Sequence, residues 1–376
     1  MKVALVVFPL HYSHGCILQT FALYSKLKEL GCEVTIFDRH PPKESLVTHF
    51  IKTARRIRAR ITQGYKGAVF FSGYYPKTIM SEQQKFIDLF KKDIECVFST
   101  LELQGVIEKG KYDAIVVGSD QTWRPKNVPN VMDYWLEFAN DLQIKKVAYA
   151  PSFGVDVWEY TEEQTKKCHE LARKFDGISV REESGVKLCK DNLGVEALQV
   201  LDPTMLWDKS FYAFYAKQCP PTHGTLNCYY LDKSDSKNKI ADYVAMKLGL
   251  NVVQINTRTE DSNAPVSERI APSIERWLSG FYYGDFVIVD SFHAMVFSII
   301  FETPFLVIGN SRRGLARFES LLSELGLQNR LVKEDTEDVA EIIKTEINWK
   351  DVKSRLDAKR DICLTFLINS LGILTH

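Results

Sequence analysis

Residues 285–308, DFVIVDSFHAMVFSIIFETPFLVI, decide the fold class of this chain. They form the most apolar region of the sequence, but Asp290, His293 and Glu302 make this region a poor membrane span. The apolar runs at its two ends predict buried strands, and the central run predicts a helix at 292–301. The region therefore predicts a strand–helix–strand unit in the core of an α/β domain.

The same alternation of strands and helices extends along the rest of the chain. Near the N-terminus it predicts a strand at 3–8, a helix at 16–30 that Gly31 ends, and a strand at 33–37. Such a β-α-β unit implies a parallel sheet with a right-handed crossover. Further strands are predicted at 112–117, 146–150, 178–180, 197–201, 228–231 and 251–255. We therefore expect two α/β domains of similar size with a cleft between them.

The length and one short motif suggest where the domains divide. The chain has 376 residues, and a single core rarely grows past about 250–300 residues. Asp202-Pro203 suggests the boundary. We expect an N-terminal α/β domain at 1–203 with a helical insertion at 41–96, a C-terminal α/β domain at 204–348, and a terminal helix at 349–376.

The composition excludes several classes of protein. Lys and Arg together number 48, as do Asp and Glu, and a chain with zero net charge is a poor general nucleic-acid binder. With 45% hydrophobic and 26% charged residues, it is typical of a globular protein rather than a disordered one. The eight cysteines show no C-x-x-C spacing, which argues against a zinc site and indicates a reducing cytoplasm. The N-terminal apolar run lacks a small-residue cleavage site, which favours a buried strand over a signal peptide.

Polar residues follow the predicted strand 112–117, at the edge where open parallel sheets bind their ligands. They are Gly118, Ser119, Asp120 and Gln121. Glycine permits a tight turn and the close approach of a ligand. Asp120 is a candidate general base or partner of an acceptor hydroxyl, and the alternative is an N-cap of the following turn. These four residues are therefore candidates for a substrate site.

Two further strand ends carry candidate residues. Ser152 follows the strand 146–150, where it either binds a ligand or forms a plain turn. Arg181, beside Glu182, stands between the strand 178–180 and a helix. An Arg is unfavourable at the positive end of a helix dipole unless it reaches an anion. Arg181 is therefore a candidate clamp for a carboxylate or phosphate, and pairing with a nearby Glu is the alternative.

The apolar region itself places a His just after a strand end. Asp290, Ser291, Phe292 and His293 connect its first strand to its helix. Ser291 is a suitable cap, and the free N–H groups of a helix start bind anions. His293 beside a phosphate could be held protonated and act as an acid, whereas the alternative is an ordinary core His. The preceding Asp-Ser pair and the strand-end position favour function.

A basic loop follows the second strand of that region. It contains Arg312 and Arg313, and Arg317 comes shortly after. These arginines either complete an anion site or are simply solvated. The sequence has no phosphate-binding P-loop, no dinucleotide G-x-G-x-x-G after its first strand, no H-E-x-x-H and no G-x-S-x-G. Metal clusters and a serine-hydrolase triad are therefore not predicted.

Seven motifs, in order, resemble the polysaccharide pyruvyl transferase family. They are HGCILQTFAL, YDAIVVGSDQTW, KKVAYAPSFG, ISVREESG, VLDPTMLW, VIVDSFHAMVFSIIFETPF and ARFESLLSELGL. Together they span about residues 1–330, nearly the whole chain, and they are specific as a set, although each motif alone is weak. The family usually has N-Y-G before L-Q, whereas this chain has Tyr12-Ser13-His14-Gly15. This departure affects the acceptor more than the donor, and Gly15 is retained as a candidate substrate-binding residue.

The resemblance implies a GT-B-like fold, with two Rossmann-like domains facing across a cleft. It also implies transfer of a pyruvyl group from phosphoenolpyruvate to a sugar hydroxyl pair of a surface polysaccharide or its lipid-linked precursor. The N-terminal domain is then the acceptor side and the C-terminal domain the donor-anion side. Arg181 is assigned as the donor clamp, His293 as acid or phosphate ligand, and Asp120 as base, with acid and base exchangeable. The donor is a substrate, and no cofactor is expected.

Two other functions remain open at this point. A GT-B-type glycosyltransferase that uses a nucleotide sugar would share the fold and the basic cleft. A non-catalytic sugar or anion binder would not depend on the chemistry of His293 and Asp120.

The helix predicted within residues 50–61 suggests where the protein acts. It has an apolar stripe of Phe50, Ala54, Ile57 and Ile61, flanked by basic residues, namely Lys52, Arg55, Arg56, Arg58 and Arg60. The stripe either packs on the N-terminal domain or lies on an anionic membrane. The second interpretation suits a cytoplasmic enzyme that works at the inner face of the membrane on a lipid-linked acceptor.

Overall fold

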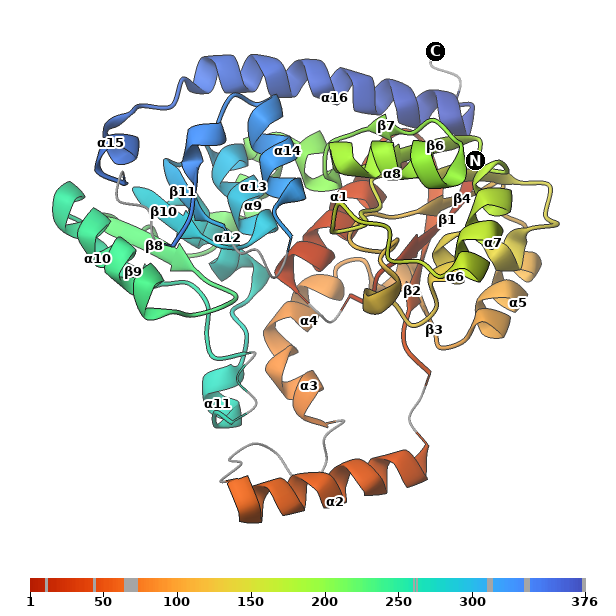
Figure 1. Ribbon diagram of the computed structural model, residues 1–376, viewed down its shortest axis with the longest axis horizontal. Helices are drawn as coiled ribbons and strands as arrows, with labels where there is room; N and C mark the ends of the chain where they lie inside the picture. The colour runs from red at the N-terminus through yellow and green to blue at the C-terminus, as the bar shows by residue number, and fades with distance from the viewer. Residues whose placement is uncertain are drawn as a thin grey trace. The chain divides into compact units, whose positions relative to one another are not determined.

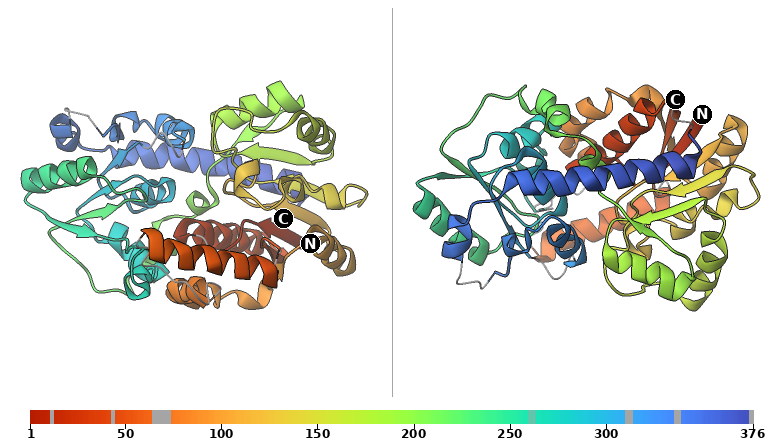
Figure 2. Two further views of the ribbon diagram at one scale, coloured as in Figure 1. Left: turned by 60° about the horizontal axis from the view of Figure 1, so that its bottom comes forward. Right: turned by 90° about the horizontal axis from the view of Figure 1, so that it is seen from above.

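The computed structural model describes residues 1–10, 13–42, 45–63, 74–259, 261, 263–309, 314–334 and 339–373. The chain divides into two compact units (Figure 1). Unit 1 comprises Met1–Pro41, Lys92–Asp208 and Gly309–His376, and unit 2 comprises Pro42–Lys91 and Lys209–Ile308. Figure 2 gives two further views of the helices and strands that build them.

Unit 1 is a Rossmann-like domain. Among the described residues it contains a seven-stranded parallel sheet in the order β3-β2-β1-β4-β5-β6-β7. The strands are β1 (Lys2–Val7), β2 (Glu33–Arg39), β3 (Ile94–Val97), β4 (Ala114–Val117), β5 (Lys145–Ala148), β6 (Gly177–Val180) and β7 (Leu198–Gln199), with β12 (Leu331–Val332) near the end of the chain. The helices are α1 (His14–Glu29), α5 (Thr100–Gly110), α6 (Val131–Tyr134), α7 (Glu162–Ala172), α8 (Glu183–Leu193), α14 (Ala316–Glu324), α15 (Val339–Lys344) and α16 (Trp349–Leu371).

Unit 2 has a smaller parallel sheet. Its strands run in the order β11-β10-β8-β9, with bounds β8 (Thr225–Tyr229), β9 (Asn251–Gln254), β10 (Phe286–Val289) and β11 (Phe305–Ile308). Its helices are α2 (Leu46–Gln63), α3 (Tyr74–Ile79), α4 (Ser81–Ile87), α9 (Lys209–Ala216), α10 (Asp235–Leu248), α11 (Val266–Arg269), α12 (Ile274–Tyr282) and α13 (Phe292–Phe301). Among the described residues of both units, the short 3-10 helices are η1 (Lys91–Asp93), η2 (Pro125–Asn127), η3 (Glu137–Ala139), η4 (Pro203–Leu206) and η6 (Gln328–Arg330).

The order of the strands locates the ligand-binding edge of each sheet. In unit 1 the order reverses between β1 and β4, and in unit 2 it reverses between β8 and β10. Open α/β sheets bind ligands outside the carboxyl ends of the strands at such a switch point. Strands this deeply buried read as continuous apolar runs, and β4 and β10 are buried along their whole length. The polar residues that follow β4 and β10 therefore lie at the switch points.

The compact units differ from the sequence-based ranges in two places. Residues 42–91 group with unit 2, whereas they were expected as an insertion in an N-terminal domain. Residues 309–376 group with unit 1, where α14 packs against α8 and α16 packs against β5 and η4. The ranges 1–203 and 204–348 follow chain order, whereas the compact units each combine segments that are distant in sequence. As a description of independently folding domains, these ranges stay a prediction.

Helix α2 exposes the apolar stripe that the sequence analysis singled out. Phe50 is 72% exposed and Ile61 is 79% exposed, and Val47 and Ile57 are exposed as well. No described part of the chain covers this stripe, so it is not ordinary core. No helix within the described residues is long and apolar enough to cross a membrane.

Candidate functional site

Three predicted strand-end segments meet at one edge of the sheet of unit 1. They follow β4, β5 and β6, which are neighbours in the sheet. A backbone bridge joins Asp120 to Pro151, and the N–H of Ser152 donates to the Asp120 carbonyl at 2.7 Å. The backbone N–H of Arg181 donates to the Pro151 carbonyl at 3.3 Å. Parallel pairing therefore brings Asp120, Ser152 and Arg181 together, as the sequence predicted.

The segment after β4 is fixed by buried contacts and carries backbone strain. The Ser119 hydroxyl donates to the Ala150 carbonyl at 2.8 Å. A Cβ on Gly118 would lie 3.2 Å from the Cγ1 of Val7 and crowd that side chain. Asp120 has a φ of +77°, which is uncommon for any residue but glycine. Its Oδ1 accepts the Gln121 N–H at 2.8 Å. Such strained positions cluster at functional sites, so Asp120 retains its candidacy as a reactive carboxylate.

Glu182 organises the segment after β5. Its Oε1 accepts the Ser152 hydroxyl at 2.9 Å, the Phe153 N–H at 2.8 Å and the Gly154 N–H at 3.2 Å, and the residue is fully buried. Gly154 has a φ of +74°, and a Cβ there would lie 2.4 Å from the Gln121 Oε1. Glu182 thus fixes Ser152 and the backbone of the next two residues, and the Gln121 side chain packs against Gly154.

Arg181 pairs with an aspartate rather than a glutamate. Its Nη1 lies 2.8 Å from the Oδ2 of Asp202, and its Nη2 lies 3.8 Å from the Oδ1 of Asp120. Burial alone would lower the pKa of Arg181, but Asp202 and Asp120 outweigh burial and raise it. Asp202 also accepts the N–H and the hydroxyl of Thr204. From sequence, Asp202 was expected at a domain boundary and within the motif VLDPTMLW, but not as the partner of Arg181, although the position of V-L-D-P at another strand end is a signal for it.

A second arginine lies close to Arg181. Arg317, the second residue of α14, is buried, and its pKa is lowered to about 10. Burial is the main cause and repulsion by Arg181 the next, partly offset by Glu182 and Asp120. Ahead of α14, a Cβ on Gly314 would lie 2.3 Å from the Gly154 carbonyl, so only glycine permits this approach. Arg317 therefore joins the group of Asp120, Arg181 and Glu182, while Arg312 and Arg313 lie outside the described residues.

The start of α1 reaches the same edge of unit 1. Ser13 caps the helix by accepting the Cys16 N–H at 3.1 Å, and Gly15 is its second residue. Burial, followed by the charges of Asp120, Asp38 and Asp202, raises the pKa of Cys16. Gly15 and Asp120 thus flank the switch point between β1 and β4.

The predicted residues of unit 2 lie at the switch point between β8 and β10. Asp290 accepts the Leu231 N–H at 2.6 Å and the Asp232 N–H at 3.1 Å, and it pairs with buried Lys237 at 2.7 Å. This carboxylate therefore holds the loop after β8 in place.

His293 stands in the first turn of α13. Ser291 is the N-cap residue, although its side chain makes no cap hydrogen bond. His293 is partly buried, with its ring 5.6 Å from that of Phe292 in an edge-on arrangement. The strand–helix junction is confirmed, while a shared cleft for Arg181 and His293 stays a prediction because they belong to different units.

Comparisons with solved structures establish the fold class. The UDP-GlcNAc 2-epimerase from Methanocaldococcus jannaschii is 12% identical, with 93% of each chain covered and a TM-score of 0.52. Arabidopsis thaliana UGT89C1, solved with UDP-L-rhamnose, is 10% identical, with 98% of each chain covered and a TM-score of 0.52. The UDP-N-acetylglucosamine 2-epimerase from Rickettsia bellii is 9% identical, covers 99% of this chain and 97% of its own, and has a TM-score of 0.51. This likeness confirms the predicted GT-B-like α/β fold.

The family is established by sequence. No curated protein matches the chain. The sequence profile described as polysaccharide pyruvyl transferase matches residues 14–312, which is well over half of the chain. That range includes the strand ends at Asp120, Arg181 and His293 described above. The chain belongs to the polysaccharide pyruvyl transferase family, and it is accordingly a transferase of polysaccharide biosynthesis with a GT-B-like fold.

Proposed function

We propose that this protein transfers a pyruvyl group from phosphoenolpyruvate to two hydroxyls of a saccharide, forming a ketal. The observation that carries the proposal is the pair of buried arginines, Arg181 and Arg317, beside Asp120 at the switch point of unit 1. In a member of this family, such a pair is suited to a small, strongly charged donor.

The donor has a carboxylate and a phosphate on a three-carbon alkene. A guanidinium matches either group with two parallel hydrogen bonds, and burial strengthens such contacts. Asp202 already balances Arg181, whereas repulsion and burial disfavour the charge of Arg317. An anion placed against Arg317 would relieve both effects. We therefore assign Arg317 to the donor together with Arg181, and His293 at the helix start of α13 to its phosphate.

The reaction can proceed with one acid and one base. The acid protonates the methylene carbon of the donor, and the first sugar hydroxyl adds to the adjacent carbon as the base removes its proton. The second hydroxyl then attacks the same carbon, the bond to the phosphate oxygen breaks, and inorganic phosphate leaves with the second proton. We assign Asp120 as the base and His293 as the acid, and the reverse assignment serves the same stoichiometry.

We further propose that the acceptor is a lipid-linked saccharide reached from the inner face of a membrane. Helix α2 supports this proposal, because the exposed apolar stripe of Val47, Phe50, Ile57 and Ile61 is combined with basic residues. The basic residues are Lys52, Arg55, Arg56, Arg58 and Arg60. A helix with this pattern can lie in the headgroup region of an anionic leaflet, and each basic residue there contributes about 1 kcal/mol.

Donor choice tests the proposed activity. Thermal unfolding is followed with phosphoenolpyruvate, inorganic phosphate, pyruvate and a panel of UDP-sugars. We expect phosphoenolpyruvate to stabilise the protein more than either fragment does, because it alone fills both anion positions. Stabilisation by a UDP-sugar alone would indicate a nucleotide-sugar glycosyltransferase. Binding that survives in His293→Ala and Asp120→Ala without any wild-type turnover would indicate a non-catalytic binder.

A further inference from the structure

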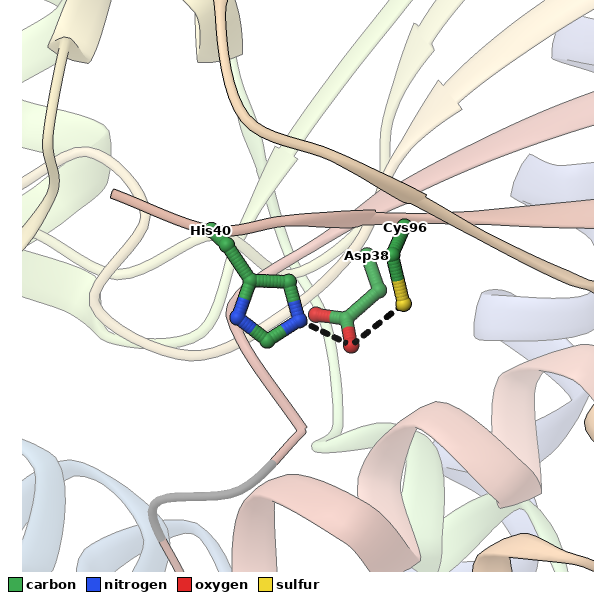
Figure 3. Close-up of side chains that lie close together, drawn as sticks. All are labelled: Asp38, His40 and Cys96. Carbon is green, nitrogen blue, oxygen red and sulfur yellow. Dashed lines mark hydrogen bonds and ion pairs between the residues drawn. The ribbon is translucent and has the colours of Figure 1, made fainter. Parts of the chain in front are cut away.

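Three side chains of different chemistry converge at the carboxyl end of β2. Asp38 and His40 alternate along one strand and so project from the same face. Cys96 on β3 is the register partner of Asp38, which places its side chain on that face too. Figure 3 shows the carboxylate of Asp38 between the imidazole of His40 and the thiol of Cys96. One ligand atom from each of these three side chains lies within 4.8 Å of the other two, and the described residues contain no other such group of His, Cys, Asp and Glu.

The surrounding backbone holds this group in position. The Leu10 N–H donates to the Oδ1 of Asp38 at 3.2 Å, which leaves Oδ2 facing the other two side chains. The His40 N–H donates to the Val97 carbonyl at 2.9 Å, so the pairing of the two strands continues to this residue. The His40 ring is stacked on Phe98, with ring centres 5.3 Å apart. A site on paired strands with supporting contacts of this kind is preorganised.

We propose that Asp38, His40 and Cys96 bind one divalent ion of the zinc class, with a fourth position open to water. A thiolate, an imidazole and a carboxylate form the mixed ligand set that Zn²⁺ accepts, and three protein ligands plus water are typical of its open sites. The sequence analysis expected no metal site because it considered only C-x-x-C and H-E-x-x-H spacings.

The distances are close to what such an ion requires. Ligand atoms of tetrahedral zinc lie about 3.3–3.7 Å apart, given bonds of about 2.0–2.3 Å. The Oδ2 of Asp38 lies 3.9 Å from the Cys96 Sγ and 2.7 Å from the His40 Nε2. The Asp38–His40 pair would therefore open by about half an ångström, and the Asp38–Cys96 pair would close slightly. Cys96 is exposed, so an ion can enter from solvent.

The proposed ion site uses none of the residues assigned to pyruvyl transfer. It lies on β2 and β3, whereas Asp120 follows β4 on the other side of β1. The proton transfers assigned above involve no metal, and the inference does not depend on them. Its test therefore uses metal binding alone.

The experiment measures zinc binding by the full, tag-free chain after a chelator has removed bound metal. Competition with a chromogenic chelator should give one tightly bound Zn²⁺ per chain. Cys96→Ser and His40→Gln should each weaken binding by more than the roughly 10–100-fold that loss of a supporting partner costs. The matched controls Cys219→Ser and His223→Gln remove a partly buried thiol and an exposed imidazole elsewhere, and they should bind as the wild type does.

Co²⁺ provides a second, spectroscopic readout. The wild-type protein should show a thiolate-to-cobalt charge-transfer band that disappears in Cys96→Ser, an exposed position where a serine is expected to be tolerated. Wild-type zinc affinity in Cys96→Ser, or no stoichiometric binding by the wild type, would overturn the proposal. A loss of zinc affinity in Cys219→Ser equal to that in Cys96→Ser would also overturn it.

Discussion

Replacing Arg317 with methionine should stabilise the free protein while it weakens donor binding. Methionine keeps most of the buried volume and removes the charge. In the folded protein the pKa of Arg317 is lowered from its ordinary value to about 10, first by burial and then by Arg181. The folded state thus disfavours the charged form, and the opposing effect of Glu182 and Asp120 is too small to restore it.

The pKa sets the upper limit of the stability change. Lowering the pKa of Arg317 from its ordinary value to about 10 corresponds to about 3 kcal/mol against the charged side chain. Arg317→Met should therefore raise the free energy of unfolding at neutral pH by up to about 3 kcal/mol, less the hydrogen bonds that the guanidinium makes. Because the pKa is depressed, the penalty is present in the wild type below pH 10 and declines as the pH rises through about 10.

Donor affinity should change in the opposite direction. A hydrogen bond to a charged group is worth about 1.5–3 kcal/mol, so Arg317→Met should weaken phosphoenolpyruvate binding about 10- to 150-fold. Urea unfolding and calorimetric titration measure the two effects on the same preparation. Arg173→Met, which removes an exposed arginine at the end of α7, is the control and should change neither. A destabilised Arg317→Met protein with unchanged donor affinity would show that Arg317 is a structural cation and refute the reasoning.

Three further predictions concern other parts of the molecule. Asp202→Asn should lower the free energy of unfolding by up to about 3–5 kcal/mol, because it leaves buried Arg181 with only the more distant carboxylate of Asp120, 3.8 Å away. The double variant Asp202→Asn/Arg181→Met should recover part of that loss, as measured by urea titration. If the losses of the two single variants simply add in the double variant, the pairing of Arg181 with Asp202 is contradicted. His293→Ala and Asp120→Ala should each reduce turnover by about 10²–10⁴-fold with near-normal circular dichroism. Wild-type turnover in either variant removes that residue from the mechanism. In α2, changing Arg55, Arg56 and Arg58 to Gln should lower the affinity for anionic vesicles at low salt roughly 100-fold, as measured by sedimentation. If the wild type binds no vesicles, or neutral ones equally well, the membrane proposal fails.

The fold was largely predictable because strands such as β4, β10 and β11 are buried along their whole length and read as continuous apolar runs. The predicted helix at 292–301 matches α13, and the predicted start of β10 is within one residue. Edge strand β3 was missed because Glu95 and Cys96 are exposed and interrupt any apolar run. The C-terminal residues 309–376 return to unit 1 through contacts far apart in sequence, which no local pattern can indicate.

The candidate site was also largely predictable, because its residues follow strands that the sequence pattern identifies. Neighbouring parallel strands end at one edge, so Asp120, Ser152 and Arg181 could be placed together from strand positions alone. The partner of Arg181 could not be identified, because Asp202 follows β7 and the choice between Asp and Glu depends on side-chain geometry. The contacts of Asp38 with Cys96 depend on the register of β2 against β3, and β3 was itself not predicted.

The fate of the bridging oxygen of phosphoenolpyruvate tests the central claim most directly. The protein is incubated with a lipid-linked saccharide acceptor and phosphoenolpyruvate that carries ¹⁸O between carbon and phosphorus, and the products are examined by mass spectrometry. Pyruvyl transfer breaks the carbon–oxygen bond, so the label should leave in inorganic phosphate while the saccharide gains an unlabelled pyruvate ketal. Reaction in D₂O should also place one deuteron in the methyl group of that ketal. Unlabelled inorganic phosphate, released together with free pyruvate while the saccharide stays unmodified, would show cleavage at phosphorus and contradict pyruvyl transfer by this protein.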